Sequence, residues 1–324
     1  MDADRVLDDV RAGGLLPAGG PVVVLLSGGR DSVCLLDVAV RIAGAGAVAA
    51  VHVNYGLRDE ASDDERHCVD LCERLGVAVT VERPRRPEAG GNVQAWARDV
   101  RYAVATRLAL ERGSPGVGVV AAGHTADDQV ETILYRLASS PSRRALLGMR
   151  PRDGLLVRPL LGVTRAQTTA YCIERGLAWR DDVTNDGDRY ARNRVRNALV
   201  PAFERIHPAA AANVLRTAAL LRDEGEVLDA LVDDQLDERG GRLEIPLERL
   251  AALPSALRRL VVQRLADGAA GRLVPGAAGH ADEVAALRRS GRALLDLGGG
   301  VRAVAERGVL HAERSSARHT GARA

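Results

Sequence analysis

VVVLLSGGRDSVCLLD, residues Val22–Asp37, joins an apolar run to a serine- and glycine-rich turn and then to an apolar helical pattern. The apolar run predicts a buried strand over Val22–Leu26, and the pattern that follows predicts a helix over Asp31–Ala43. Gly28 and Gly29 tolerate backbone angles that other residues resist, and they let a ligand approach the main chain closely. The stretch therefore predicts a strand, a binding turn and a helix in direct succession.

This turn has the chemistry of an anion site. The first N–H groups of the helix have no partner within it, and its positive dipole end faces the same place. Ser27 and Ser32 add hydroxyl donors, so the turn suits phosphate oxygens. Phosphate would repel Asp31 unless a cation lies between them, which predicts a role for Asp31 in holding Mg²⁺. The alternative is an ordinary strand–helix turn that Asp31 and Ser32 cap.

Strand and helix patterns alternate along the first two thirds of the chain. Apolar runs separated by helices of this length indicate βαβ units and a parallel sheet, whose strand ends form the ligand-binding edge. We therefore predict an α/β fold with a parallel-sheet N-terminal domain. The further strands are expected at Val48–Asn54, Val77–Glu82 and Val117–Ala122, and the further helices at Ala61–Leu75, Val93–Arg112 and Asp127–Ala138.

The alternation stops near Pro201, and a smaller, mainly helical C-terminal domain is expected. Its predicted helices are Ala209–Leu236, two segments within Leu247–Asp267, and Ala281–Ser290; its predicted strands are Arg292–Leu297 and Val301–Ala305. The expected organisation is an N-terminal domain over 1–205, a helical linker over 206–240, a C-terminal domain over 241–314 and a disordered tail over 315–324.

Composition narrows the class of protein. All 45 basic residues are arginine, so the lysine of a Walker-type phosphate loop is missing. The charged N-terminus lacks a signal-peptide core, and no apolar run is long enough for a membrane span. A cytoplasmic protein without a membrane partner is therefore expected. The four cysteines contain no CxxC pair and are expected to be buried and reduced.

The string SGGRDS resembles the pyrophosphate-binding loop of the ATP pyrophosphatase (PP-loop) superfamily, whose members cleave ATP between its α- and β-phosphates. Further strings make the joint set similar to the tRNA(Ile)-lysidine synthase family. They are VHVNYGLRDE (Val51–Glu60), ARDVRY (Ala97–Tyr102), GHTADDQVETILYRL (Gly123–Leu137), LLGM (Leu146–Met149), RPLL (Arg158–Leu161), and WRDDVTN with RNRVRNALVP between Trp179 and Pro201.

This resemblance implies an adenine-nucleotide alpha-hydrolase fold and an ATP-pyrophosphatase catalytic role for residues 1–205, and tRNA or substrate binding for residues 241–314. It also implies an activity. The family joins free L-lysine to C2 of the wobble cytidine in an isoleucine tRNA with a CAU anticodon. ATP first adenylates the C2 oxygen and releases pyrophosphate; the lysine amine then attacks C2 and AMP leaves. The resemblance assigns the ATP and pyrophosphate loop to Ser27, Gly28, Gly29, Arg30, Asp31 and Ser32.

Four polar side chains after the fourth expected strand form the second candidate group: His124, Asp127, Asp128 and Glu131. Their spacings of three and four place them on one helical face, where three carboxylates repel each other unless cations intervene. We assign Asp127 and Asp128 to Mg²⁺ or to the incoming amine, and Glu131 to their support. A carboxylate or His124 would accept the proton of the amine. The alternative is a capped helix with an acidic first turn.

Other polar residues are candidates for ATP or RNA contacts. His52 and Asn54, at the second strand's end, suit an adenine or ribose contact, or they are simply a satisfied polar pair. Arg98 and Arg101 share a helical face and suit the α-phosphate or the RNA backbone; a solvated face is the alternative. The tRNA-binding candidates are Arg143, Arg144, Arg189, Arg192, Arg194 and Arg196.

Two features depart from the family pattern, and two rival functions stay open. Tyr55 stands where the family usually has histidine, and Ser139–Ala145 lacks a glycine-rich stretch often found before LLGM. A PP-loop tRNA thiolase would also adenylate a tRNA base, but it usually carries CxxC pairs. A non-catalytic nucleotide-binding module would explain the glycine turn and leave the carboxylates without a role.

Overall fold

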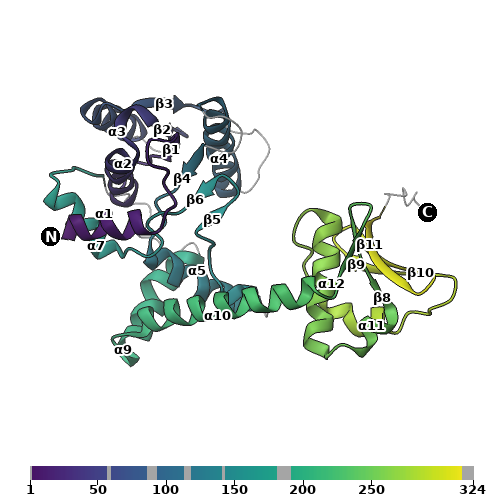
Figure 1. Ribbon diagram of the computed structural model, residues 1–324. Helices are drawn as coiled ribbons and strands as arrows, with labels where there is room; N and C mark the ends of the chain where they lie inside the picture. The colour runs from purple at the N-terminus through teal and green to yellow at the C-terminus, as the bar shows by residue number, and fades with distance from the viewer. Residues whose placement is uncertain are drawn as a thin grey trace, which may run out of the picture. The chain divides into compact units, whose positions relative to one another are not determined.

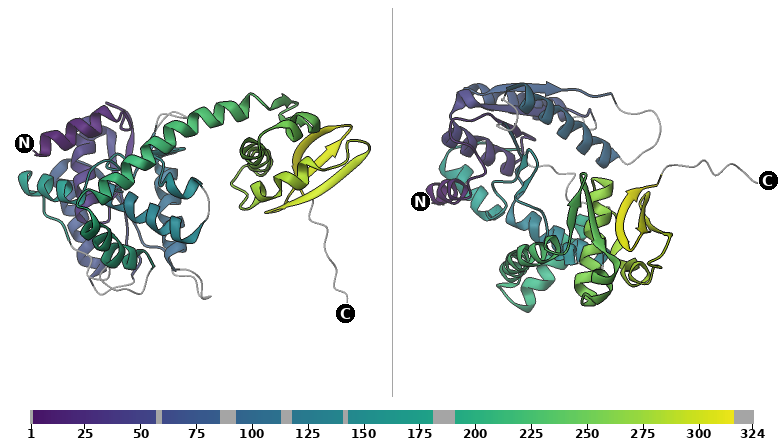
Figure 2. Two further views of the ribbon diagram at one scale, coloured as in Figure 1. Left: turned by 90° about the horizontal axis from the view of Figure 1, so that it is seen from below. Right: turned by 45° about the vertical axis from the view of Figure 1, so that its right-hand side comes forward.

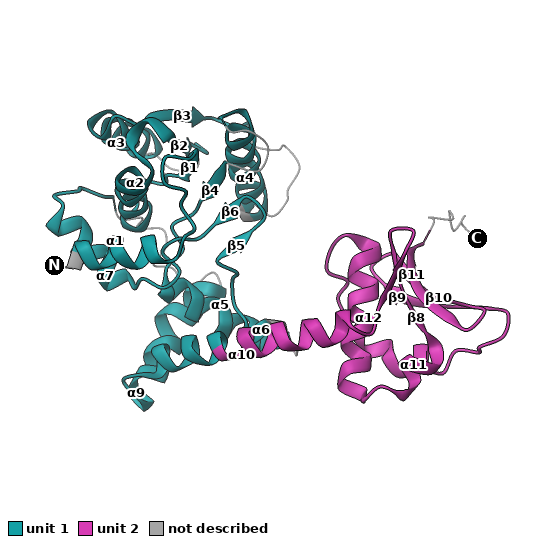
Figure 3. Cartoon of the chain, viewed as in Figure 1, with its two compact units in different colours: residues 1–219 teal, residues 220–324 magenta. Residues whose placement is uncertain are grey.

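The computed structural model describes residues 2–56, 60–85, 93–112, 118–140, 143–180 and 191–315. The chain divides into two compact units, residues 1–219 and 220–324 (Figure 3). Each unit has its own hydrophobic core. Among the described helices, none has both the length and the apolar character needed to cross a bilayer.

The first unit is built on a largely parallel sheet with strand order β3-β2-β1-β4-β6-β5. Strand β1 (Val22–Leu25) lies in the middle and pairs in parallel with β2 (Val48–Val53) and β4 (Val119–Ala121). Strand β3 (Ala78–Glu82) pairs with β2, and β6 (Leu156–Val157) pairs with β4. Only β5 (Arg152–Asp153) is antiparallel among the described strands of this sheet. The predicted parallel-sheet α/β fold is confirmed.

Helices cover both faces of this sheet (Figure 1). Val22 and Val24 belong to the core shared with α1 (Asp2–Ala12), α2 (Arg30–Ala43), α3 (Ala61–Leu75) and α7 (Arg165–Glu174). Val23 and Leu25 belong to the opposite core, which α4 (Val93–Arg112) covers. Successive strand residues point to opposite faces, so a strand buried on both sides must be apolar throughout. This explains the unbroken apolar run that precedes the glycine turn.

Helix α5 (Ala126–Ser139) follows β4 and is held by a small core of its own. Val130 and Leu134 of α5 pack with Val195, which lies in a π-helical turn over Val195–Leu199. That turn joins α8 (Ala191–Arg194) to α9 (Val200–Ile206). This packing brings the arginine-rich segment around residue 194 against the helix that carries the carboxylates.

The long helix α10 (Ala210–Asp233), green in Figure 2, contains the boundary between the units, which Figure 3 marks by its change of colour. The boundary at residue 219 falls within the 206–240 range assigned to a linker. The subdivision into catalytic, linker and tRNA-binding segments stays a prediction. The expected tail lies almost wholly outside the described residues, since only Ser315 of 315–324 is described.

The second unit contains more sheet than expected. Its five strands have the order β7-β8-β11-β10-β9 and pair antiparallel. The two predicted strands are present as β9 (Arg292–Gly298) and β10 (Val301–Glu306). Strands β7 (Asp237–Arg239), β8 (Arg242–Pro246) and β11 (Val309–Arg314) were not predicted, because charged residues interrupt their apolar pattern.

The helices of this unit agree better with the prediction. Helices α11 (Leu247–Ala252) and α12 (Ser255–Ala270) flank Pro254 as expected. Helix α13 is shorter than predicted and ends at Ala285. Together with the sheet, α12 encloses a core of small aliphatic side chains.

Candidate active site

The glycine turn forms a rigid cradle at the end of β1. Gly28 has a φ of 85°, in the left-handed region that favours glycine. The Ser32 hydroxyl accepts from Ser27 N–H at 3.2 Å and donates to the Gly29 carbonyl at 2.8 Å. No side chain caps α2, and the amides of Arg30 and Asp31 have no partner among the described residues. These amides are thus available to an anion.

Asp31 lies in the first turn of α2, between the glycine turn and α7. Its Oδ1 accepts hydrogen bonds from Thr168 Oγ1 at 2.5 Å and from Arg30 Nε at 3.1 Å. Its Oδ2 lies 4.0 Å from Arg165 Nε and accepts no hydrogen bond from a described residue. One carboxylate oxygen of Asp31 is therefore fixed, and the other can take a further ligand.

Arg165, at the start of α7, contacts all three carboxylates of α5. Its backbone N–H donates to Asp127 Oδ2 at 2.8 Å. Its guanidinium donates to Asp128 Oδ1 and to Glu131 Oε1, each at 2.7 Å. Because the same side chain lies near Asp31, Arg165 links the glycine turn to the acidic helix. The predicted convergence of these two motifs is present, but an arginine accompanies it.

A second arginine binds the same acids from α8. Arg192 Nη2 donates to Asp128 Oδ1, and Arg192 Nε donates to Glu131 Oε2, both at 3.2 Å. Arg196 Nε lies 3.8 Å from Glu131 Oε1. The sequence predicted that Mg²⁺ or a substrate amine would offset the repulsion among these carboxylates. In the structure, arginines of the chain itself offset it.

These ion pairs set the charge state of the site. Burial alone would favour the neutral form of Asp128, but Arg165, the Thr125 backbone amide and Arg192 together hold its pKa below the usual range. For Arg165, burial acts against the charge, and the carboxylates more than compensate, so its pKa is raised. Asp128 and Arg165 are therefore both ionised at neutral pH.

Gly123, two residues after the end of β4, lets the two motifs approach each other. A Cβ atom at this position would lie 3.0 Å from the Asp31 carbonyl oxygen and 3.2 Å from Ser32 N. Both neighbours are backbone atoms at the start of α2, so they cannot swing away as a side chain would. Only glycine fits here without moving the first turn of α2.

Replacing this glycine should separate the motifs. We expect Gly123→Ala to destabilise the chain by about 1–3 kcal/mol, because overpacking forces the backbone to shift. Gly162→Ala is the matched control, since no atom lies within 4 Å of its added Cβ and its φ is not in the left-handed region. Urea denaturation of both variants measures the difference in their free energies of unfolding. Equal stability of the two variants would show that the first turn of α2 can shift without cost.

His124 lies between β4 and α5, close to Asp128, and is mostly buried. It precedes the N-cap residue Thr125, so it is not on the face of α5 as predicted. Its Nδ1 is buried and has no hydrogen-bond partner among the described residues. Burial lowers the pKa of His124 to about 4; nearby Asp128 acts in the opposite direction, and Arg158, Arg192 and Arg101 add to the lowering. The imidazole is therefore neutral at pH 7 and able to accept a hydrogen bond, whereas its low pKa disfavours the predicted role as proton acceptor.

This depressed pKa predicts a pH dependence of stability. The unfolded chain binds a proton at His124 near the ordinary pKa of about 6.5, whereas the folded chain does so only near about 4. The unfolded state thus binds more protons in this window, and stability should fall as pH falls from about 6.5 to about 4. His124→Gln should flatten that part of the curve in denaturation experiments. An unchanged slope would mean that His124 titrates normally.

The predicted nucleoside contacts at the end of β2 have protein partners. His52 is buried, and its Nδ1 lies 3.0 Å from the Leu26 carbonyl oxygen. Asn54 donates to Glu65 Oε2 at 2.9 Å and to the Ala61 carbonyl. Beside Asn54 lies a cavity of about 380 Å³, lined by Asn54, Tyr55, Gly56, Ala61, Ser62, Glu65, Arg83 and Pro84. His52 and Asn54 thus both have hydrogen-bond partners within the protein at this end of the sheet.

Tyr55 lines this cavity and is firmly placed. Its hydroxyl donates to the Ala97 carbonyl at 2.7 Å, and its ring meets Trp96 edge to face at 5.7 Å. Half-burial raises the pKa of the phenol. Tyr55, which stands where the family usually has histidine, therefore forms a packed aromatic wall of the cavity at the end of β2.

Arginines gather on the α4 side of the site. Arg98 and Arg101 lie over the Tyr102 ring, at 5.1 and 5.7 Å from its centre. Arg158 is 5% exposed and Arg136 is partly buried; they donate to the carbonyls of Arg150 and Gly148, respectively. Burial lowers the pKa of both, and the neighbouring arginine charges lower it further. Such a concentration of positive charge favours a phosphate-bearing ligand.

Of the six arginines predicted to bind tRNA, the structure describes the side chains of four. Arg192 and Arg196 face the carboxylates. Arg143 and Arg194 lie in α6 (Arg143–Leu146) and α8. Arg189 and the side chain of Arg144 lie outside the described residues, as does part of the segment Ser139–Ala145. Their contact with RNA stays a prediction.

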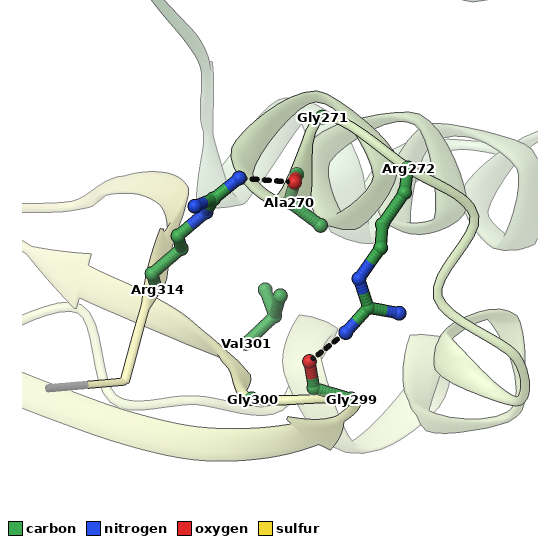
Figure 4. Close-up of a pocket in the computed structure, with 7 residues that line it drawn as sticks. All are labelled: Ala270, Gly271, Arg272, Gly299, Gly300, Val301 and Arg314. Atoms are coloured by element: carbon green, nitrogen blue, oxygen red, sulfur yellow. Dashed lines mark hydrogen bonds between the residues drawn. The ribbon is translucent and has the colours of Figure 1, made fainter. Parts of the chain in front are cut away.

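Neither the cysteines nor a cavity in the second unit adds to this site. The four cysteines are free and buried, as predicted. In the second unit, a cavity of about 390 Å³ lies between the end of α12 and the turn before β10 (Figure 4). Its arginines already serve the fold: Arg314 donates to the Ala270 carbonyl and Arg272 to that of Gly299. Across the described ranges, no three His, Cys, Asp or Glu side chains converge on a metal position.

Sequence reasoning missed Arg165 and Thr168. A signal was present, because Thr164 and Gln167 have the spacing of a capping box, and the structure shows both hydrogen bonds of that box. Predicting α7 from this signal would have placed Arg165 and Thr168 at an exposed helix start. Their contact with Asp31 and the acids depends on the tertiary fold, which no local pattern gives.

Comparison with known proteins agrees with this geometry. Residues 16–203 match the model of the PP-loop domain. A U34-tRNA thiolase structure from Methanococcus maripaludis shares the fold, with a TM-score of 0.55 and 17% identity over 68% of this chain and 79% of that one.

Curated relatives are named tRNA(Ile)-lysidine synthase. The chain is 35% identical to one from Gloeobacter violaceus, over 80% of each protein, and 37% identical to one from Symbiobacterium thermophilum, over 92% of this chain and 66% of that one. It spans less of other relatives: 64% of the Dehalococcoides mccartyi protein and 48% of one from Thermus thermophilus. These matches show that the chain is a PP-loop protein and belongs to the tRNA(Ile)-lysidine synthase family.

Proposed function

We propose that this chain joins L-lysine to C2 of the wobble cytidine of an isoleucine tRNA with a CAU anticodon. The C2 oxygen attacks the α-phosphorus of ATP, the bond between the α- and β-phosphates breaks, and pyrophosphate leaves. The lysine ε-amine then attacks C2, loses a proton, and AMP departs with the C2 oxygen. Because tRNA and ATP are cytoplasmic, we place this activity in the cytoplasm.

One observation carries the proposal: the phosphate cradle and the acidic helix meet at one edge of the sheet. Arg165 contacts Asp127, Asp128 and Glu131 and lies 4.0 Å from Asp31. A non-catalytic nucleotide module would need the cradle but not the buried acids beside it. An adenylating ligase needs both, because one group must bind the leaving diphosphate while another receives the amine.

ATP is expected to lie along this edge. The free amides of Arg30 and Asp31 and the turn at Gly28 and Gly29 suit the β- and γ-phosphates. The cavity beside Asn54 has room for the nucleoside, since β2 is the direct neighbour of β1. Arg98 and Arg101 are candidates for the α-phosphate, where positive charge would stabilise the transition state.

Mg²⁺ is expected to join ATP at Asp31. The unbonded Oδ2 atom of Asp31 and phosphate oxygens form the hard oxygen ligand set that Mg²⁺ prefers, and the metal would neutralise the charge of the leaving diphosphate. Asp127 and Asp128 are paired with Arg165, so a metal role for them would require that these contacts open. For these two acids we favour the alternative role, the binding of the amine.

The test is product release with defined substrates. The chain should release pyrophosphate from ATP when given the CAU-anticodon isoleucine transcript, and should transfer radiolabelled lysine to that transcript. Label from a sulfur donor in place of lysine would support the rival thiolase. ATP binding with neither release nor transfer would support the nucleotide-binding module instead. A transcript with a C34-to-U substitution is the control that must give no product.

A further inference from the structure

Two guanidinium groups share the carboxylates of α5, but they are held very differently. Arg165 is 16% exposed, makes two hydrogen bonds of 2.7 Å through its side chain and adds one through its backbone. Arg192 is 46% exposed, and its hydrogen bonds to the same two acids measure 3.2 Å. Exposed groups are held less firmly than buried ones, so an incoming cation can replace Arg192 more readily than Arg165.

We propose that Arg192 is an internal substitute for the substrate's ammonium group, and that lysine binds by displacing it from Asp128 and Glu131. The inference rests on the proposed function, because it takes lysine as the substrate. An ammonium has three donors and can reach the oxygens that Arg192 vacates, Asp128 Oδ1 and Glu131 Oε2. Arg165 keeps its contact with Glu131 Oε1 throughout.

Charge balance supports an exchange rather than an addition. Asp127, Asp128 and Glu131 carry three negative charges, and Arg165 with Arg192 supplies two positive ones. Replacing Arg192 by one ammonium leaves that sum unchanged. Loss of Arg192 without a replacement would leave the nearly buried Glu131 with fewer cationic partners, which is costly.

The exchange also couples the binding of lysine to the binding of RNA. Once displaced, the Arg192 guanidinium is free to contact an RNA phosphate, as the sequence predicted for it. If RNA binding draws Arg192 away, the acids become available to lysine. Because such coupling is reciprocal, lysine should then strengthen RNA binding by the same factor.

Calorimetric titration of lysine without tRNA tests the exchange. Arg192→Gln should lower the dissociation constant of lysine by about fivefold, because the competitor is gone. Arg196→Gln is the matched control: it removes an equally exposed arginine that lies 3.8 Å from Glu131 Oε1 but is not hydrogen-bonded to it. That variant should change the constant less than twofold. Norleucine, which lacks the ε-amine, should gain nothing from Arg192→Gln.

The outcomes separate this inference from the proposed function. Weaker or equal lysine binding in Arg192→Gln, with binding intact in the unchanged chain, overturns the exchange alone. No lysine binding to any of the three proteins at millimolar concentration overturns both. With saturating tRNA, the unchanged chain should approach the affinity of Arg192→Gln, and the variant should gain little more. An equal gain in both proteins would assign the coupling to other residues.

Discussion

Asp31→Ala is expected to lower pyrophosphate release by about a thousandfold while the chain stays folded. The substitution removes the carboxylate next to the phosphate cradle and, with it, the expected Mg²⁺ ligand. It also frees Arg30 and Thr168, and the hydrogen bond from Thr168 to Oδ1 holds the first turn of α2 against α7. Pyrophosphate release with saturating ATP and tRNA measures the effect, and circular dichroism checks the fold.

Two further variants make this result specific. Asp31→Asn keeps a polar group for Thr168 and Arg30 but removes the charge, so it should lose almost as much activity as the alanine variant. Asp63→Ala removes an exposed acid of α3 that pairs with Arg66 and should retain activity. Full activity in Asp31→Asn would exclude a role for the charge of Asp31 in catalysis.

Arg165→Gln is expected to cause the largest loss of stability of any single exchange in the site. Glu131 is 3% exposed. Arg165, which is more buried than Arg192, donates to Glu131 and to Asp128. Breaking a buried ion pair by removing one partner typically costs about 3 kcal/mol, because the other charge stays in a poorly solvated place. Chemical denaturation should show this loss, and pyrophosphate release should fall as the acids separate from Asp31.

A double-mutant cycle separates the ion pair from simple packing. Adding Glu131→Gln to Arg165→Gln removes both charges, so the double variant should be more stable than the sum of the single losses predicts. Arg165→Lys keeps one charge but lacks the fork that reaches two carboxylates, and it should recover only part of the stability. Strict additivity would show that Arg165 and Glu131 do not interact.

The sequence was most informative where local patterns and tertiary burial agree. The unbroken apolar run at Val22–Leu26 is typical of a strand buried on both faces, and β1 is such a strand. The helix predictions over Ala61–Leu75 and Val93–Arg112 match α3 and α4 residue for residue. In these segments the periodicity follows directly from which face the core covers.

Prediction failed where structure depends on distant partners. Strand β11 was missed because its apolar stretch is short, with His311 inside it and Glu313 and Arg314 at its end, and pairing with β8 and β10 defines it. At the site, the spacing of Asp127, Asp128 and Glu131 correctly placed them on one face. The arginines that neutralise them come from α7 and α8, more than thirty positions further along the chain, so no spacing rule could find them.

The claim on which the account depends is that the turn at Gly28–Ser32 binds the β- and γ-phosphates of ATP. A crystal structure with Mg²⁺ and an ATP analogue whose α- and β-phosphates are joined by a methylene group tests it most directly. The account predicts the two terminal phosphates on the amides of Arg30 and Asp31, with the α-phosphate directed toward the acids of α5. A nucleotide bound elsewhere, with this turn empty, would contradict it.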